Sequence, residues 1–348
     1  MGRHVVSTHQ LTHYQKMITM NLMAQQATPL GSRILLAATR LSARGSSTRM
    51  PLFLVTMLTC AVAGFACQAA ARESTPTTSP PSVSVEVVTQ DLAVGDSRLA
   101  LVVLADGRPL SEGAVHLVFY YLQDPQPVVR AEADAVPRLD QHEHANLADH
   151  VDLPFYVAPV RFDRAGPWGM EAQVNQPWSA TRVARTRLDV REQPRAPAIG
   201  SPAPRSASKT LRTAPPEELS SAVPIDPELY GLSIAEAIET GQPLVVAFAT
   251  PAFCQSRTCG PQLHVIEHLK ERYREQVNFI HVEVYDKPQE ATRDLRSARP
   301  SPTVTEWRLP SEPWVFVVDG QGSIAARFEG FTTVDELEPE LRQVLARP

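Results

Sequence analysis

Two cysteines, Cys254 and Cys259, are the residues of this 348-residue chain with the clearest capacity for covalent chemistry. They lie between an apolar run at residues 243–250 and an amphipathic segment striped by Leu263 and Ile266. This placement predicts a strand that runs into a helix. Free N–H groups and partial positive charge at a helix N-terminus favour thiolate over thiol. Because a thiolate attacks a disulfide and a neighbouring thiol resolves the mixed product, the pair predicts a thiol–disulfide centre.

The elements that must position this pair extend over the C-terminal third of the chain. Apolar runs predict four strands, at residues 244–248, 279–284, 314–318 and 324–328. A capping box of Ser233 and Glu236 predicts one helix, and a capping box of Thr333 and Glu336 predicts another, with a kink at Pro339. The cysteines would open a third helix between the first two strands.

This order of elements, over about residues 229–348, resembles the thioredoxin fold. Cys259-Gly260-Pro261 matches the first three residues of the family motif Cys-Gly-Pro-Cys. The resemblance implies an α/β thioredoxin-like domain at residues 223–348. It also implies that the cysteine pair is a redox centre acting on protein disulfides.

The resemblance further implies a substrate-docking segment. Glu312 and Pro313 stand directly before a predicted strand, where the family keeps a cis-proline that faces the disulfide. Glu312 and Pro313 would therefore bind the substrate chain, with Trp307 and Trp314 flanking the proline as an apolar rim. For both tryptophans, ordinary packing in the core is the alternative.

The chain also departs from the family pattern. Four residues separate the cysteines, where the family has two, so two registers are open. In one, Cys254 attacks and Cys259 resolves; in the other, Cys259 takes the attacking position, Gln262 replaces the second family cysteine and Cys254 resolves. The apolar approach before it favours Cys254 as the exposed thiol. Ala247 or Phe248 stands where the family has a buried acid that helps proton transfer. The absence of this acid argues against fast thiol–disulfide exchange.

Two other functions remain open for the cysteine pair. The first is a structural disulfide in a non-enzymatic binding scaffold, although closing so small a loop gains little chain entropy. The second is copper handling, with Cys254, Cys259 and His264 or His281 as soft and imidazole ligands. No cofactor is predicted.

Residues 83–190 form a different region with period-two alternation, as at Val83, Val85 and Val87. Short alternating strands with turn signals between them predict an all-β antiparallel sandwich. The stretch Phe162-x-x-Ala165-Gly166-Pro167-Trp168 resembles the late hairpin of small Ig-like domains on exported bacterial proteins, which implies an Ig-like sandwich that binds or presents. Residues 191–222 are rich in proline and predict a semi-rigid linker between the two domains.

A second candidate metal site lies in a polar stretch of the β-rich region. It contains His142, Glu143, His144 and His150, which offer imidazole and carboxylate ligands. A solvated loop is the expected state of this stretch.

The N-terminus predicts export. Residues 50–71 are uncharged and mostly apolar, follow arginines and end in small residues, as in a signal peptide. A lipoprotein signal with Cys67 at its end, or a single uncleaved membrane anchor, are the alternatives. Residues 1–49 are then a basic leader or a misassigned start, and residues 72–82 a flexible tether. The predicted location is extracytoplasmic and membrane-anchored, with thiols and disulfides of exported proteins as partners.

The charge distribution excludes one class of partner. Residues 1–72 hold seven basic and no acidic side chains, and the rest of the chain holds 26 basic against 38 acidic ones. An acidic body gives no basic face for phosphates, so no nucleic-acid binding is expected.

Overall fold

The structure is a computed structural model that describes residues 82–138, 154–176, 180–254, 258–296 and 298–346. The predicted leader, the tether up to residue 81 and the His142, Glu143, His144 and His150 cluster lie outside the described residues. Residues 79–348 form one compact unit. Within the described part, no helix is both long and apolar enough to cross a membrane.

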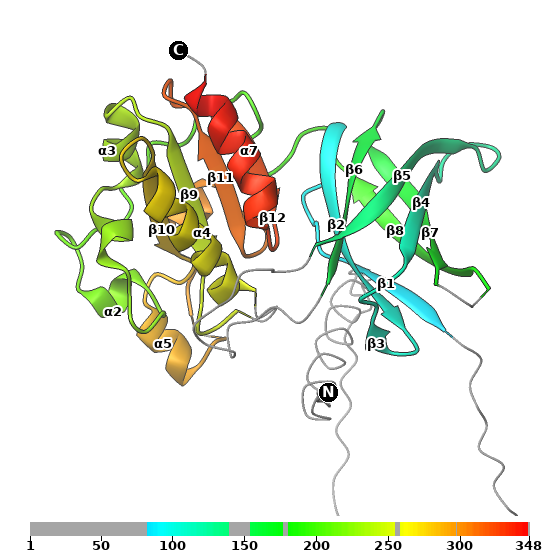
Figure 1. The fold of residues 1–348 in the computed structure, drawn as a ribbon, viewed down its shortest axis with the longest axis horizontal. Helices are drawn as coiled ribbons and strands as arrows, with labels where there is room; N and C mark the ends of the chain where they lie inside the picture. Colours follow the sequence, from blue (N-terminus) through cyan, green and yellow to red (C-terminus); the bar gives the residue numbers. More distant parts are fainter. Residues whose placement is uncertain (1–81, 139–153, 177–179, 255–257, 297, 347–348) are drawn as a thin grey trace, which may run out of the picture. The chain divides into compact units, whose positions relative to one another are not determined.

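The N-terminal domain is all-β and antiparallel, as predicted. Its strands are β1 (Val83–Val87), β2 (Gly95–Ala105), β3 (Arg108–Pro109), β4 (Ala114–Tyr121), β5 (Val129–Arg138), β6 (Phe155–Phe162), β7 (Gly166–Asn175) and β8 (Arg182–Val190). They form one connected sheet in the order β1-β2-β6-β5-β4-β7-β8, with β3 beside β2 (Figure 1). The first part of β5 pairs with β4, and its last three residues pair with β6, so the sheet folds over at β5.

Aromatic residues fill the interior of this folded sheet. Trp168 is fully buried, and its ring lies 5.1 Å from that of Phe162 and 5.6 Å from that of Tyr121, measured between centroids. Phe119 meets Phe162 edge-on at 5.8 Å. The alternating pattern of the strands therefore places one face of the sheet around a single core.

The C-terminal domain is an α/β unit whose element order matches the prediction. Its sheet has the order β10-β9-β11-β12, built from β9 (Leu244–Ala249), β10 (Asn278–Glu283), β11 (Trp314–Val318) and β12 (Ile324–Glu329). β9 and β10 are parallel, and the other pairs are antiparallel. The helices are α2 (Pro216–Leu219), α3 (Ile234–Glu239), α4 (Cys259–Tyr273), α5 (Pro288–Arg293), α6 (Pro302–Glu306) and α7 (Val334–Leu345), with a 3-10 turn at Pro227–Tyr230. α4 and α7 lie next to each other over one face of the sheet (Figure 1).

Both faces of β9 are covered. All six of its residues are buried, and Leu244, Val246 and Phe248 belong to one core with α3 and α6. Both predicted capping boxes are present, at Ser233 and Thr333, and α7 continues through Pro339. The strand that leads to the cysteines is thus fixed on both sides by packing.

Trp307 belongs to this core and does not form a rim. It is 0% exposed, its ring centroid lies 4.7 Å from that of Phe316, and its Nε1 donates to Ser206 Oγ at 3.0 Å. Trp314 is also 0% exposed. Both tryptophans are therefore packing residues, the alternative left open by the sequence, because an enclosed ring presents no surface to a substrate.

The proline-rich residues 191–222 pack against the C-terminal domain. Ala196 and Ala203 are buried in the core of that domain. The Gly200 N–H donates to the Ile324 carbonyl at 2.8 Å, and Pro202 forms a bridge with Ser323. Where a spacer is predicted, the chain thus lies along the edge of β12.

Candidate functional site: a disulfide at the start of α4

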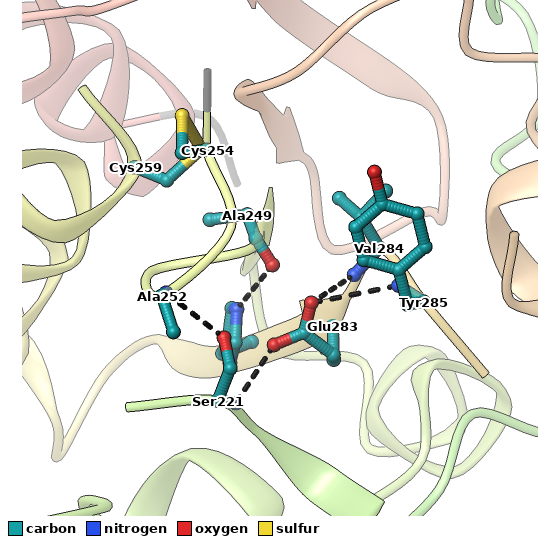
Figure 2. The surroundings of a disulfide bond; sticks show 9 residues. Ser221, Ala249, Ala252, Cys254, Cys259, Glu283, Val284 and Tyr285 are labelled. Carbon is teal, nitrogen blue, oxygen red and sulfur yellow. Dashed lines mark hydrogen bonds between the residues drawn. A yellow bond between two sulfur atoms is a disulfide. The ribbon is translucent and has the colours of Figure 1, made fainter. Parts of the chain in front are cut away.

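Cys254 and Cys259 form a disulfide at the junction of β9 and α4, with their Cα atoms 5.9 Å apart (Figure 2). A tight turn follows β9, because the N–H groups of Phe253 and Cys254 both donate to the Thr250 carbonyl, at 3.1 and 2.9 Å. Cys259 is the first residue of α4. The predicted position of the pair at a strand-to-helix junction is correct.

The two cysteine residues differ in their exposure to solvent. Cys259 is 0% exposed, whereas Cys254 is partly exposed. An incoming thiol or disulfide can reach only a sulfur that solvent reaches. By position along α4, Cys259 corresponds to the first cysteine of the resembled motif, but Cys254 is the more exposed of the two residues.

Gln262 takes the place expected for a second helix cysteine and anchors the first turn of α4. Its side chain is fully buried. Its Oε1 accepts the Thr332 N–H at 2.8 Å, and its Nε2 donates to the Thr332 carbonyl at 3.3 Å. These two hydrogen bonds attach the helical turn that carries Cys259 to the segment between β12 and α7.

A buried carboxylate supports the other side of the disulfide loop. Glu283, at the end of β10, is 4% exposed. Its carboxylate accepts the N–H groups of Ser221 at 2.8 Å and Val284 at 3.0 Å, and Ser221 Oγ accepts the Ala252 N–H at 3.1 Å (Figure 2). Glu283 is thereby linked through Ser221 to the residues just before Cys254.

Two further ionisable groups, the carboxyl of Glu312 and the phenol of Tyr285, interact electrostatically with Glu283. Burial, and then repulsion by Glu283, raises the pKa of Glu312. Burial, and then the charges of Glu312 and Glu283, raises the pKa of Tyr285, whose ring meets Phe253 edge-on at 6.3 Å between centroids. Burial also raises the pKa of Glu283, opposed in part by Thr250 and Ser221. Burial therefore shifts the titration of both carboxyl groups to a higher pH than in water.

His281 supports the end of β9. Its Nε2 lies 3.1 Å from the Ala249 carbonyl, and its Nδ1 lies 2.6 Å from Tyr230 Oη. These partners fit a neutral ring that donates from Nε2 and accepts from Tyr230. Burial lowers the pKa of His281 to about 4, opposed in part by the bond to Ala249.

The metal alternative is not supported by the geometry. His281 is committed to Tyr230 and Ala249, and among the described residues no three His, Cys, Asp or Glu side chains lie close enough to hold a metal ion. Cys254, Cys259 and His264 are therefore not brought together as a ligand set.

The predicted docking residues lie in the segment before β11. The Glu312–Pro313 peptide bond is cis. Pro313 is buried, its carbonyl accepts the Gly330 N–H at 2.9 Å, and Glu312 is partly exposed. Glu283 and Ser221 are the supporting residues that the sequence did not single out. The only sequence signal for Glu283 is an acid closing an otherwise apolar strand.

Comparisons with known proteins identify the C-terminal fold. Residues 230–345 match the family model of a thioredoxin-like domain. A Chlorobium tepidum structure described as thiol:disulfide interchange protein DsbE has a TM-score of 0.31 at 16% identity, covering 43% of this chain and 100% of its own. A second from Chlorobium tepidum, described as a thiol:disulfide interchange protein of the thioredoxin family, has a TM-score of 0.30 at 14% identity with the same coverage. The search of curated proteins gave no match. The match to the family model shows that the C-terminal domain is thioredoxin-like, as predicted.

Proposed function

We propose that this thioredoxin-like domain exchanges disulfides, with Cys254 as the attacking sulfur and Cys259 as the resolving one. One observation carries the proposal: a partly exposed cysteine is bonded to a fully buried one at the first residue of a helix. In such a pair, the accessible sulfur can form a mixed disulfide with a substrate, and the buried sulfur then resolves it.

The chemistry transfers two electrons. In the reduced protein, the Cys254 thiolate attacks one sulfur of a substrate disulfide. An S–S bond forms to Cys254, and the second substrate sulfur leaves as a thiolate that takes a proton. The Cys259 thiolate then attacks Cys254 Sγ, closes the internal disulfide and releases the first substrate sulfur. The reverse sequence oxidises a substrate dithiol.

Raised carboxyl pKa values suit this exchange. Glu283 is bonded to the disulfide loop through Ser221, and Glu312 interacts electrostatically with Glu283; both carboxyls favour the neutral form more than they do in water. Such groups hold protons at a higher pH than an exposed carboxyl does. Glu312 and Pro313 dock the substrate backbone beside Cys254 in this proposal.

The proposed setting is outside the cytoplasm, with membrane attachment through the leader. The support is the apolar run at residues 50–71 after an acid-free basic stretch, and the presence of a single cysteine pair outside the leader. The β-rich domain is proposed to be an Ig-like module that holds the redox domain near its partners, which are exported proteins with thiols or disulfides.

The reduction potential of the Cys254–Cys259 pair in the full chain tests the function. Glutathione buffers set the potential, and thiol trapping counts the reduced protein. A potential between about −120 and −270 mV supports exchange. A potential below about −300 mV contradicts it and indicates a structural disulfide in a binding scaffold.

A further inference from the structure

Glu329, the last residue of β12, is a carboxylate that joins two domains. It is 5% exposed. Its Oε1 accepts the Gln90 N–H at 2.9 Å and its Oε2 accepts the Asp91 N–H at 3.0 Å, both from the segment between β1 and β2. The same Oε1 accepts Ser311 Oγ–H at 2.6 Å. A buried carboxylate requires such donors, because an ionised group without partners is costly inside a protein.

Ser311 stands directly before Glu312 and the cis-bonded Pro313. Its hydroxyl donates to Glu329 and accepts the Trp314 Nε1–H at 3.1 Å. The Ser311 hydroxyl therefore connects the start of the docking segment to Glu329 and to Trp314. Of these two partners, Glu329 is itself bonded to the N-terminal domain.

Gly330 makes a second connection at the same place. Its N–H donates to the Pro313 carbonyl, and its φ of 77° is a conformation that favours glycine. A Cβ there would lie 2.9 Å from Val88 Cγ1 of the N-terminal domain. The turn after β12 is thus in close contact with the docking segment and with the N-terminal domain.

Arg98 of β2 makes the third connection. It forms a two-pronged ion pair with Glu336 at 2.9 and 3.1 Å, and donates to the carbonyls of Glu329 at 2.9 Å and Phe331 at 2.8 Å. The next residue, Thr332, holds Gln262 in the first turn of α4. The N-terminal domain therefore holds the segment that supports both the docking residues and Cys259.

We propose that the N-terminal domain sets the geometry of the substrate-docking segment, with Glu329 as the positioning residue between them. This proposal rests on the exchange function proposed above. Glu329 touches neither sulfur nor substrate; it acts through Ser311 on Glu312 and Pro313. Recognition of a protein substrate is then a joint property of both domains, whereas the redox potential is set within the C-terminal domain.

The test uses the full chain with Glu329→Gln, Ser311→Ala and Ser311→Thr. Insulin, turned over with dithiothreitol as the electron donor, is the protein disulfide. The small disulfide, 5,5′-dithiobis(2-nitrobenzoic acid), reacts once with the pre-reduced protein. KM and kcat for insulin, the rate with the small disulfide and the reduction potential are measured for each protein. Ser311→Ala removes the hydroxyl but leaves the bonds of Glu329 to Gln90 and Asp91, and Ser311→Thr restores a hydroxyl. Thermal unfolding by circular dichroism reports whether each variant is folded.

We expect Ser311→Ala and Glu329→Gln to raise the KM for insulin by about tenfold, the size of one lost hydrogen bond. The potential and the rate with the small disulfide should stay unchanged, and Ser311→Thr should behave like the wild type. If Glu329→Gln does not fold, the two Ser311 variants decide. An unchanged insulin KM in folded Ser311→Ala, or equal losses with both substrates, overturns the positioning role while exchange stands. A wild-type protein without exchange activity removes the proposed function, and this inference with it.

Discussion

Cys254 is partly exposed while Cys259, its disulfide partner, is completely enclosed at the first residue of α4. After reduction, we expect iodoacetamide to alkylate Cys254 at least about tenfold faster than Cys259, because only an accessible thiolate reacts. Mass spectrometry of quenched samples gives both rates. Equal rates, or faster labelling of Cys259, would contradict the assignment of the attacking sulfur.

A trapping variant tests the same assignment during turnover. Cys259→Ser removes the resolving thiol, so we expect a stable mixed disulfide between Cys254 and a disulfide-containing peptide. The matched variant Cys254→Ser should give much less adduct, since Cys259 is enclosed. Non-reducing electrophoresis measures both, and a stronger adduct with Cys254→Ser would reverse the roles.

His281 makes the stability of the domain depend on pH. Its pKa is lowered from 6.5 to about 4 in the folded protein, so the unfolded chain binds a proton that the folded one does not between these values. Stability is therefore complete above about pH 6.5 and falls as pH decreases towards 4, by roughly 3 kcal/mol for this group. Urea unfolding between pH 4 and 8 measures it. His281→Phe should remove this component, and an equal slope in wild type and variant would contradict it.

Glu283, two residues after His281 in β10, makes the stability of the domain depend on pH in the opposite direction. Burial raises its pKa above 4.5, so the folded protein holds a proton longer than the unfolded chain as pH rises. Its contribution to stability is then fully present below pH 4.5 and is lost as pH rises through the raised value. We expect Glu283→Gln to gain stability relative to the wild type as pH increases from 4.5. The exposed variant Glu239→Gln is the control, and a flat Glu283→Gln difference would argue against a buried, titrating carboxyl.

Asp91 holds the proline-rich segment in place. Its carboxylate is fully buried, pairs with Arg327 at 2.6 Å, and accepts the N–H groups of Arg195 at 2.8 Å and Ala196 at 3.0 Å. Asp91→Asn should cost about 3 kcal/mol or more of unfolding free energy, because breaking a buried pair leaves Arg327 uncompensated.

Trypsin provides a second measurement of the same contact. Cleavage after Arg195 should be slow in the wild type and faster in Asp91→Asn. The control is Asp96→Asn, whose pair with Arg161 is exposed and should contribute less than about 1 kcal/mol. Rapid cleavage of the wild type would show that the segment is a free linker.

Local rules predicted much of the C-terminal domain. Both capping boxes, the strand Trp314–Val318 and the cysteine pair at the start of α4 follow from short-range sequence patterns. The cis bond before Pro313 followed from the family resemblance. Each of these features depends on residues that are close in the sequence, either directly or as parts of a short sequence motif.

Features that depend on distant pairing were not predicted in detail. Alternation indicated the strands of the N-terminal domain, but not that β5 would divide its pairing between β4 and β6. Proline content indicated a spacer, whereas buried alanines between the prolines pack on a core formed later in the chain. Glu283 looked like one acid at the end of an apolar strand, because its partner Ser221 is 62 residues away.

Glu336 performs two structural tasks with one carboxylate. It closes the capping box that begins α7, and it receives the guanidinium of Arg98 from β2. A helix in one domain and an ion pair to the other are therefore completed by one carboxylate, whose Oε2 takes part in both. Loss of the N-terminal domain would expose the first turn of α7, and fraying of α7 would release Arg98. Heat should therefore melt the two domains in a single cooperative transition, although each has a core of its own.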